Sequence, residues 1–436
     1  MKFNNLLVIT YYFPPIRSIG VIRNFNLVKY FTQYISEITV ITTTNQDILP
    51  AEPMPTPSSV NIQKAFTFDY RSLMALRKNR NSPHLTDEEK KNWISRFLVK
   101  LLRSFPFNLL IGEGGFFYII NGLSLGKKEI IKRNNYTVIY SSFPTFSDHV
   151  IAYLLKRRFR EKTFWVADFR DLHTDPIYDL VYFRKFQHWC NYFILKKADL
   201  ITTVSHGLAE QLQKYHPNVS VLQNGVELKD RPETDHYKKF TIAYTGSLFV
   251  DERDPTPFLE IIKSLVDEGD IEKSDLQFLY AGKDGERMNA WVDEYQLGSV
   301  FQRLGLLSRD EAMNLQEKTH LNLLLSSSHV NMTGVLTGKF FEYLGARNPI
   351  ILFIKGIKDI EFENIFAELN AGKIAYHNEP SKIEMREYIL AAYQKWKDTG
   401  SLDHHINLEK LKGKFSWNKS IENLLLNILK LQQVDL

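Results

Sequence analysis

Residues 333–349 (TGVLTGKFFEYLGARNP) join a glycine-bearing loop to a short helix that carries a cation and a carboxylate. Thr337 is of the type that precedes a helix as its N-cap, and 340–346 have the composition of the helix itself. Lys339 and Glu342 are three residues apart, so their side chains share one face. The segment therefore predicts a positive and a negative group side by side at the start of a helix.

The start of this helix has the chemistry of a diphosphate site, because backbone N–H groups and the positive end of the helix dipole attract phosphate oxygens. Lys339 adds a full positive charge. Glu342, one turn further along, can accept hydrogen bonds from ribose hydroxyls. The alternative is an amphipathic helix with a solvated Lys and Glu. We predict a pocket for a nucleotide diphosphate with a sugar attached, to which the loop contributes Gly334, Val335, Leu336 and Thr337.

The segment resembles the donor-binding segment of family 4 glycosyltransferases of the GT-B architecture, which has two Rossmann-like domains. That family usually carries two glutamates separated by seven residues. Glu342 matches the second glutamate, whereas the first falls on Gly334, so the chain departs from the full pattern. The resemblance implies retaining transfer of a sugar from a nucleotide diphosphate sugar to an acceptor. The departure leaves open how the sugar itself is held.

A second segment, YTGSLFVDERDP, follows the first strand-like run in the second half of the chain. Gly246 and Ser247 offer unhindered backbone N–H groups there, and Arg253 carries a planar fork of donors that suits phosphate oxygens. The segment resembles the Gly-rich turn of the same family, which implies that Arg253 and Lys339 clamp the donor diphosphate. The alternative is a surface ion pair between Arg253 and Asp254, which would stabilise little.

The resemblance also implies where the nucleoside binds. In such enzymes it lies against loops that follow strands of the second domain, and Gly305 and Leu306 occupy such a loop here. Backbone contacts carry no side-chain code, so the sequence leaves the identity of the base open.

Glycosyl transfer needs stabilisation of the charge that develops on the leaving diphosphate. Some enzymes use a metal held by an Asp-x-Asp triplet, and no such triplet occurs in this sequence. Metal ligation by Asp168 and Asp171 is a weak alternative. The charge must then be met by Arg253, Lys339 and helix-terminal N–H groups. We therefore expect transfer without a metal or any other cofactor.

Three loops of the first half follow strand-like runs, at the position where open α/β sheets bind ligands. The first, YYFPPIRSIG, ends in a glycine that lets the backbone approach a substrate closely. It resembles the acceptor-side loop of the family, and SSFPTFSDH and DFRD resemble other loops of the same domain. The implied acceptor-side residues are Gly20, Arg23, Ser142, His149, Arg170 and Asp171. The alternatives are a proline-stiffened turn, a structural histidine and an internal Arg170–Asp171 ion pair.

Strand-like and helix-like segments alternate twice along the chain, which predicts an α/β fold with parallel sheets. We expect two doubly wound Rossmann-like domains facing across a cleft, with a C-terminal helix at 421–431 that crosses back. The acceptor-side domain takes 1–228 with 415–436, and the donor-binding domain takes 238–414, joined by a charged linker at 229–239. The expected strands are 6–10, 38–42, 138–141, 164–167, 200–204 and 219–222, then 240–244, 276–281, 300–304, 321–325 and 350–353.

Composition is that of an ordinary globular protein, with 436 residues, 44% hydrophobic and 24% charged. The net charge of +5 permits an anionic partner without demanding one, and no basic motif points to nucleic acid. The single cysteine, Cys190, excludes an intrachain disulfide and a cysteine zinc site, and fits a reducing cytoplasm. No apolar run approaches the roughly 20 residues of a membrane-spanning helix.

Residues 94–105 form a basic amphipathic segment. Such a helix can lie on an anionic membrane, or it can cover the core of its own domain with its cations outward. The first possibility would place the protein at the inner face of the plasma membrane. Apolar side chains at helical spacing are Ile94, Phe97, Leu98, Leu101, Leu102 and Phe105, and the cations are Arg96, Lys100 and Arg103.

The resulting interpretation is a retaining, metal-independent glycosyltransferase acting on a glycan or lipid-linked acceptor. Family resemblance favours a role in cell-surface polysaccharide biosynthesis, which is an argument by association. One alternative is a nucleotide-sugar epimerase of the same fold, which would need acid and base groups near the sugar. The other is a non-catalytic, nucleotide-binding homologue, which Gly334 in place of glutamate would suit.

Overall fold

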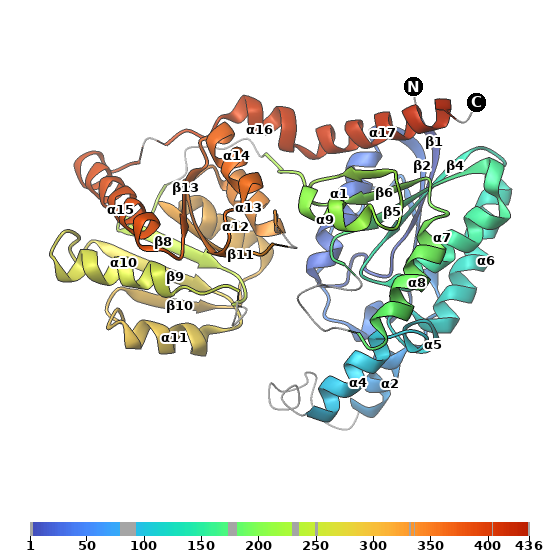
Figure 1. Ribbon diagram of the computed structural model, residues 1–436, viewed down its shortest axis with the longest axis horizontal. Coiled ribbons are helices and arrows are strands. Elements are labelled where there is room, and N and C mark those ends of the chain that lie inside the picture. Colours follow the sequence, from blue (N-terminus) through green and yellow to red (C-terminus); the bar gives the residue numbers. More distant parts are fainter. Residues whose placement is uncertain are drawn as a thin grey trace. The chain divides into compact units, whose positions relative to one another are not determined.

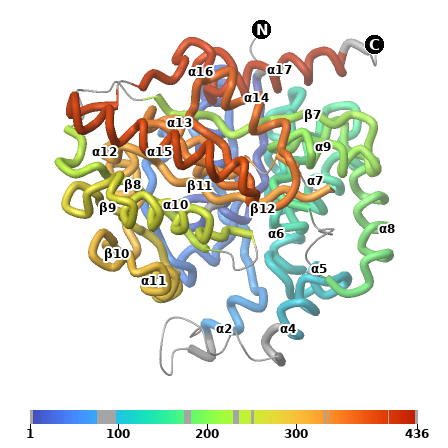
Figure 2. The backbone as a smooth tube through the Cα atoms, turned by 60° about the vertical axis from the view of Figure 1, so that its left-hand side comes forward, coloured from blue at the N-terminus to red at the C-terminus, as the bar shows by residue number. Residues whose placement is uncertain are grey.

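The computed structural model describes residues 3–78, 93–172, 181–228, 235–248, 252–330, 333–334, 336–402 and 404–434. The chain forms two compact units: unit 1 comprises Met1–Gln223 with Ser420–Leu436, and unit 2 comprises Asn224–Lys419. Each unit contains one parallel β-sheet with helices on both of its faces (Figures 1 and 2). The predicted class, α/β with two Rossmann-like sheets, is confirmed.

The sheet of unit 1 has seven strands in the order β3-β2-β1-β4-β5-β6-β7. Strand β1 pairs with β2 on one side and with β4 on the other, so the order reverses between β1 and β4. Open α/β sheets bind ligands at the carboxyl ends of the strands beside such a reversal. The strands are β1 (Phe3–Ile9), β2 (Ile35–Thr43), β3 (Val60–Ala65), β4 (Thr137–Ser142), β5 (Thr163–Phe169), β6 (Leu200–Thr203) and β7 (Val219–Val221).

The central strands of unit 1 are buried on both faces. Strands β4 and β5 are buried along their whole length, as expected where helices cover both sides of a parallel sheet. The edge strand β3 differs, because exposed polar residues interrupt its apolar ones. Its sequence, VNIQKA, was expected to be loop up to residue 62, and the structure corrects this.

Helices of unit 1 begin where the sequence offers a cap. Helix α1 (Ile19–Phe31) starts three residues before the predicted helix 22–34, because Oγ of Ser18 accepts a hydrogen bond from the N–H of Gly20. The other helices are α2 (Tyr70–Lys78), α4 (Trp93–Arg103), α5 (Phe107–Leu110), α6 (Gly115–Arg133), α7 (Phe146–Arg158), α8 (Arg184–Leu195) and α9 (His206–Leu212), with 3₁₀ turns η1 (Asn45–Ile48) and η2 (Arg160–Lys162).

The sheet of unit 2 has six strands in the order β10-β9-β8-β11-β12-β13, and its order reverses between β8 and β11. The strands are β8 (Phe240–Thr245), β9 (Leu276–Ala281), β10 (Phe301–Gly305), β11 (Leu321–Ser328), β12 (Ile350–Gly356) and β13 (Gly372–Tyr376). The helices are α10 (Thr256–Asp267), α11 (Gly285–Glu294), α12 (Arg309–Lys318), α13 (Gly338–Ala346), α14 (Ile360–Leu369), α15 (Glu379–Thr399) and α16 (Leu408–Phe415).

Strand β13 was not predicted from the sequence. It is a short edge strand, GKIAY, and only Ala375 in it is fully buried. It forms because its backbone continues the parallel ladder of β12. A strand that pairs on one side only carries a weak apolar signal, so pairing rather than composition determines it.

The C-terminal helix α17 (Trp417–Val434) returns to unit 1, as predicted, and residues 420–436 belong to that unit. The hydroxyl of Tyr34 donates to Glu422 at 3.1 Å, and the amide of Asn427 donates to Ser220 at 2.9 Å. Residues 229–234 of the expected linker lie outside the described residues.

Among the described helices, none has both the length and the hydrophobicity needed to cross a lipid bilayer.

Candidate functional site

In unit 2, the loop after β8 and the start of α13 meet at Gly246. A Cβ on Gly246 would overlap Cε of Lys339 and would lie 3.2 Å from its Nζ. The φ of Gly246 is +146°, a conformation that favours glycine. The chain therefore needs glycine here, because the side chain of Lys339 runs directly over its backbone.

Arg253 belongs to the same arrangement. Its Nη1 donates to the carbonyl oxygen of Ser247 at 3.0 Å. Burial raises the pKa of the Tyr244 phenol, and the Arg253 guanidinium beside it partly opposes that rise. The carboxyl end of β8 therefore holds Arg253 in place through Ser247 and Tyr244.

The two cations and one carboxylate lie within electrostatic reach of one another. Burial lowers the pKa of the Lys339 ammonium, Glu342 opposes this shift, and Arg253 adds to it by charge repulsion. Arg253 and Lys339 are therefore adjacent positive groups that only one neighbouring carboxylate partly balances. Such a site favours a ligand with more than one negative charge.

Glu342 is positioned by residues that the sequence analysis did not single out. The Nε2 of Gln316, on α12, donates to Oγ1 of Thr245 at 2.9 Å and reaches Oε2 of Glu342 at 3.5 Å. The backbone N–H of Thr245 donates to the hydroxyl of Tyr343 at 3.0 Å. These bonds link α12, β8 and α13. Their partners are far apart in sequence and carry no motif that would have revealed them.

The backbone donors at the start of α13 differ from those predicted. The N–H of Gly334 donates to Oδ2 of Asp359 at 2.7 Å, and the N–H of Leu336 donates to the oxygen of Gly334 at 2.7 Å. Both groups therefore already have partners inside the protein, because the loop curls into a turn under α14. Val335 lies outside the described residues.

The first turn of α13 still offers donors to a ligand. Thr337 occupies the N-cap position, but its side chain makes no capping hydrogen bond. In the described part of the chain, no group accepts from the backbone N–H of Gly338 or Lys339. An oxyanion at this end of α13 would meet these N–H groups, the helix dipole and the Lys339 ammonium together.

The predicted nucleoside loop lies at the end of the neighbouring strand β10. Gly305 has φ +75°, and a Cβ there would meet open space. The oxygen of Gly305 accepts from the N–H of Gly282 at 2.9 Å, while the side chain of Leu306 is 70% exposed. The hydroxyl of Tyr280 donates to the oxygen of Gly246 at 3.0 Å. This bond couples the end of β9 to the loop that carries Lys339.

In unit 1, the structure brings two of the predicted acceptor-side residues together. A Cβ on Gly20 would lie 2.7 Å from Nη2 and 2.8 Å from Nη1 of Arg170, so the guanidinium packs on this glycine. The Nε of Arg170 donates to the oxygen of Phe143 at 3.0 Å. Burial lowers the pKa of Arg170, and Asp171 and Asp168 oppose that shift. Ser142 is buried nearby in sequence at the end of β4, and Asp171 is exposed.

Arg23 and His149 have structural surroundings. Arg23 forms a buried ion pair with Asp168, with Nε–Oδ2 and Nη2–Oδ1 distances of 3.0 and 2.8 Å. His149 is fully buried, and its Nδ1 lies 2.7 Å from Oγ of Ser141. The geometry favours the structural alternative for both residues, because each side chain is enclosed in the core of unit 1.

A buried polar network that the sequence analysis missed lies beside these loops. Oδ1 of Asp148 accepts from the hydroxyl of Tyr118 at 2.7 Å, and its Oδ2 accepts from the backbone N–H of Tyr11 at 3.0 Å. The hydroxyl of Tyr11 in turn donates to Asp69 at 2.8 Å. Burial raises the pKa of Asp148 to about 8, although the bonds from Tyr118 and Tyr11 oppose the shift.

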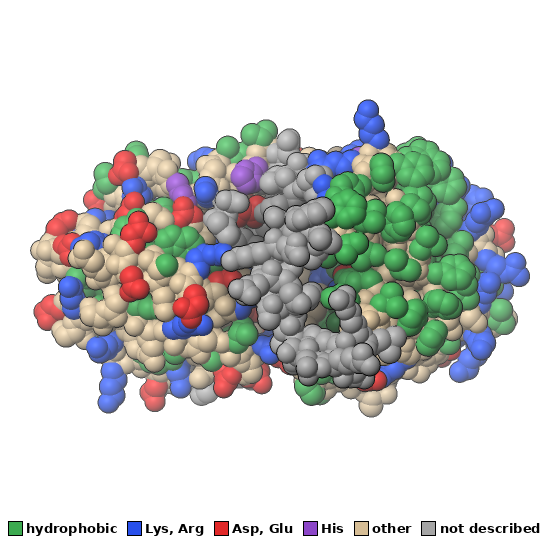
Figure 3. Space-filling model, turned by 90° about the horizontal axis from the view of Figure 1, so that it is seen from below, with side chains coloured by type: hydrophobic (Ala, Val, Ile, Leu, Met, Phe, Trp, Pro, Cys, Tyr) green, Lys and Arg blue, Asp and Glu red, His purple; other side chains and the backbone are tan. Residues whose placement is uncertain are grey.

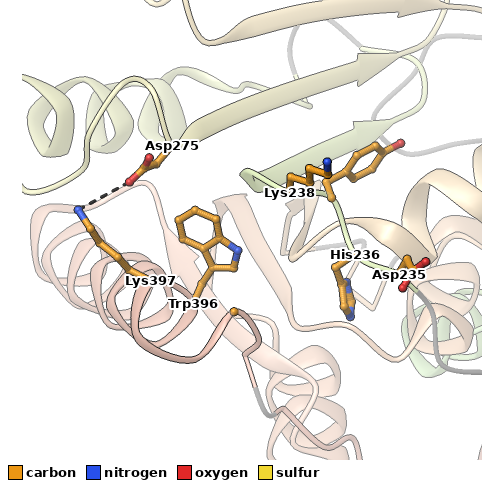
Figure 4. A pocket seen from close by; sticks show the side chains of 8 residues that line it. Asp235, His236, Lys238, Asp275, Trp396 and Lys397 are labelled. Atoms are coloured by element: carbon orange, nitrogen blue, oxygen red, sulfur yellow. Dashed lines mark ion pairs between the residues drawn. The ribbon is translucent and has the colours of Figure 1, made fainter.

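Unit 2 also has a hollow of about 750 Å³ at the other end of its sheet (Figure 4). Its residues precede β8 and β9 or lie near the end of α15, and an ion pair of 3.7 Å joins Lys397 to Asp275. Ligands of open α/β sheets bind at the carboxyl ends of strands, so we place the candidate site at Gly246 and not here. The hollow is lined by Asp235, His236, Tyr237, Lys238, Asp275, Trp396, Lys397 and Gly400.

Comparison with known proteins gives a likeness of fold. No family model matches the chain, and no curated protein matches it in sequence. The structure is similar to sucrose-phosphate synthase from Thermosynechococcus elongatus, with a TM-score of 0.62, 11% identity, and coverage of 99% of this chain and 100% of that one. It is also similar to the lipopolysaccharide outer core galactosyltransferase WaaB, with a TM-score of 0.55, 11% identity, and coverage of 98% and 99%.

A third similar structure is TarM from S. aureus, crystallised with fondaparinux, α-GlcNAc-glycerol and UDP. Its TM-score is 0.57 at 11% identity, with coverage of 98% of this chain and 100% of that one.

The raised pKa of Asp148 gives a prediction for stability. Between about pH 4 and pH 8 the folded chain holds a proton that the unfolded chain has released. The free energy of unfolding should therefore fall as pH rises through this range, by about 1.4 kcal/mol for each pKa unit of difference. Asp148→Asn, which resembles the protonated carboxyl, should flatten this dependence in urea unfolding followed at pH 5, 7 and 9. The exposed Asp47→Asn serves as control, and an unchanged slope in Asp148→Asn would contradict the assignment.

Similarity over nearly the whole length of three glycosyl-transferring enzymes, together with the two reversed parallel sheets, shows that this chain has the GT-B glycosyltransferase fold.

Proposed function

We propose that the protein is a retaining, metal-independent glycosyltransferase that moves a sugar from a nucleotide diphosphate sugar to a glycan or lipid-linked acceptor. The observation that carries the proposal is the convergence of Arg253 and Lys339 on the loop after β8, next to Glu342. The motif resemblance to family 4 enzymes and the GT-B fold support it. The same resemblance favours a role in cell-surface polysaccharide biosynthesis.

The proposed chemistry depends on the leaving group. Negative charge grows on the diphosphate as the bond to the sugar breaks, and preorganised donors lower the barrier to that step. Arg253, Lys339 and the N–H groups at the start of α13 take this role, and no metal or other cofactor is assigned. Glu342 accepts from ribose hydroxyls, and Gly305 with Leu306 contacts the base.

Unit 1 takes the acceptor in this proposal. Gly20 and Arg170 form the acceptor-facing pair, with Ser142 and Asp171 in the adjoining loops. Arg23 and His149 hold these loops in place from the core. The proposed domains are 1–228 with 415–436 for the acceptor and 238–414 for the donor.

We further propose that unit 1 binds an anionic membrane through α4 and α8. The exposed fractions of Phe97 and Leu98 on α4 are 46% and 48%, so folding leaves much of this apolar row uncovered. The side chains of 93–96, which include the predicted Ile94 and Arg96, lie outside the described residues. Hydrophobic side chains cover much of this side of unit 1 (Figure 3).

Helix α8 reverses the usual arrangement of a surface helix. It buries Gln187 and Asn191, whose side chains bond each other at 3.0 Å. Its outer stripe consists of exposed aromatic residues, in which Trp189 stacks on its neighbours at 5.5 and 5.8 Å. A helix that faces water would place these groups the other way round. The exposed stripe comprises Phe183, Phe186, Trp189 and Phe193.

Cations border this aromatic stripe. The Nζ of Lys100 on α4 lies 4.5 Å from the ring centre of Tyr182, and the Nζ of Lys196 lies 5.0 Å from that of Phe193. Aromatic side chains with lysines at their edge suit the interface of a bilayer, where rings enter the headgroup region and ammonium groups meet anionic lipids. The charge complementarity therefore points to an anionic lipid surface.

The donor assignment predicts a loss of turnover. Arg253→Ala and Lys339→Ala should each reduce it by about 10²–10³-fold, because each removes a preorganised donor to the leaving group. Release of UDP or GDP from a panel of nucleotide sugars, with a lipid-linked glycan extract as acceptor, measures the effect. Arg386→Ala, which removes a surface arginine of unit 2 paired with Glu268 and Asp270, is the control. Near-normal turnover of Arg253→Ala would show that the clamp is wrongly assigned.

The membrane assignment predicts a loss of vesicle binding. Trp189→Asp should abolish co-flotation with vesicles containing phosphatidylglycerol, and phosphatidylcholine vesicles should bind the parent protein weakly. Ile383→Asp in unit 2 is the matched control, because Ile383 and Trp189 are both 57% exposed. Circular dichroism of each variant checks that the fold is intact. Equal flotation of Trp189→Asp and the parent would refute membrane docking by α8.

A further inference from the structure

Gly334 lies under the start of α14. Its φ is +65°, which favours glycine, and its N–H donates to Oδ2 of Asp359 at 2.7 Å. Asp359 is also the N-cap of α14, since its Oδ1 accepts from the N–H of Phe362 at 3.2 Å. One carboxylate therefore fastens the loop before α13 to the first turn of α14.

A second carboxylate occupies the space where a side chain at 334 would begin. A Cβ on Gly334 would overlap Oε2 of Glu361, and would lie 3.0 Å from the carboxyl carbon of Glu361 and 3.5 Å from its Cβ. Glu361 is half-buried. The carboxylate thus rests on the α-carbon of Gly334, and no larger residue fits there without displacing it.

This placement bears on the missing glutamate. Position 334 is where the family that the chain resembles carries the first of its two glutamates, and the second is matched by Glu342. We propose that Glu361 supplies this missing carboxylate from α14 and accepts hydrogen bonds from hydroxyl groups of the donor sugar. The inference rests on the proposed function, and it answers how the sugar is held when position 334 is glycine.

A purely structural role for Glu361 is the rival explanation, because acidic residues stabilise the first turn of a helix. Glu363 lies in the same turn and is engaged by Lys358 at 2.9 Å and by the hydroxyl of Tyr376 at 3.0 Å. Asp359 already caps the helix. Glu363 is therefore the matched control, since it shares the helix end and lacks the contact with Gly334.

The test compares two ligands on the same protein. Calorimetry measures the affinity of the full chain for UDP and GDP, and then for UDP-glucose, UDP-N-acetylglucosamine and GDP-mannose. For whichever sugar binds more tightly than its free nucleotide, Glu361→Gln should remove that gain by about tenfold or more, because a bond to a charged acceptor is lost. The affinity for the free nucleotide should stay within twofold, and Glu363→Gln should change neither value.

The outcomes separate this inference from the proposed function. An unchanged sugar-dependent gain in Glu361→Gln would overturn the inference and leave the donor site standing, as would equal losses in Glu361→Gln and Glu363→Gln. Failure of the parent protein to bind any of these ligands would overturn the proposed function and the inference with it.

A stability measurement tests the contact without a ligand. Gly334→Ala should lower the midpoint of thermal unfolding in the parent protein, because the new methyl group displaces the Glu361 carboxylate and the φ is unfavourable for alanine. In a Glu361→Ala background only the second cost remains, so the same substitution should lower the midpoint less. Equal shifts in the two backgrounds would show that Glu361 does not occupy this space.

Discussion

The functional account depends on two positive side chains that unit 2 holds beside each other in the absence of a ligand. Arg253 is fixed by the carbonyl oxygen of Ser247, and Lys339 lies on the backbone of Gly246. Burial and charge repulsion both disfavour the Lys339 ammonium, as its lowered pKa shows, and Glu342 compensates only in part. An arriving diphosphate would relieve this repulsion, so a cost in the empty protein becomes affinity for the donor. Preorganisation of this kind also favours the charged transition state, because the groups need not rearrange during the reaction.

The sequence predicted this convergence because it follows from the topology. The loop after β8 and the loop before α13 both lie at the carboxyl edge of one parallel sheet, so Arg253 and Lys339 meet although 86 positions separate their numbers, 339 − 253. Strongly apolar strands such as β4 and β5 were predictable for a related reason, since burial on both faces leaves a continuous signal. The edge strands β3 and β13 lack that signal, because half of each is polar or partly exposed.

Residues defined by tertiary partners were beyond sequence analysis. Gln316 and Tyr343 position Glu342 through bonds to Thr245, and nothing in their local sequence marks them. Glu361 was missed for the same reason, since its contact with Gly334 joins two loops. Arg23 and His149 err in the other direction: their types suggest chemistry, whereas Asp168 and Ser141 enclose them in the core of unit 1. A polar residue after a strand therefore marks a site only when its partners leave it accessible.

The central claim is that Arg253 and Lys339 receive the diphosphate of the donor. A crystal structure of the full chain soaked with UDP or GDP tests this most directly. The account predicts phosphate oxygens within hydrogen-bond distance of both side chains, with the ribose beside Glu342. Electron density for the nucleotide at any other place in unit 2, away from these two cations, would contradict it.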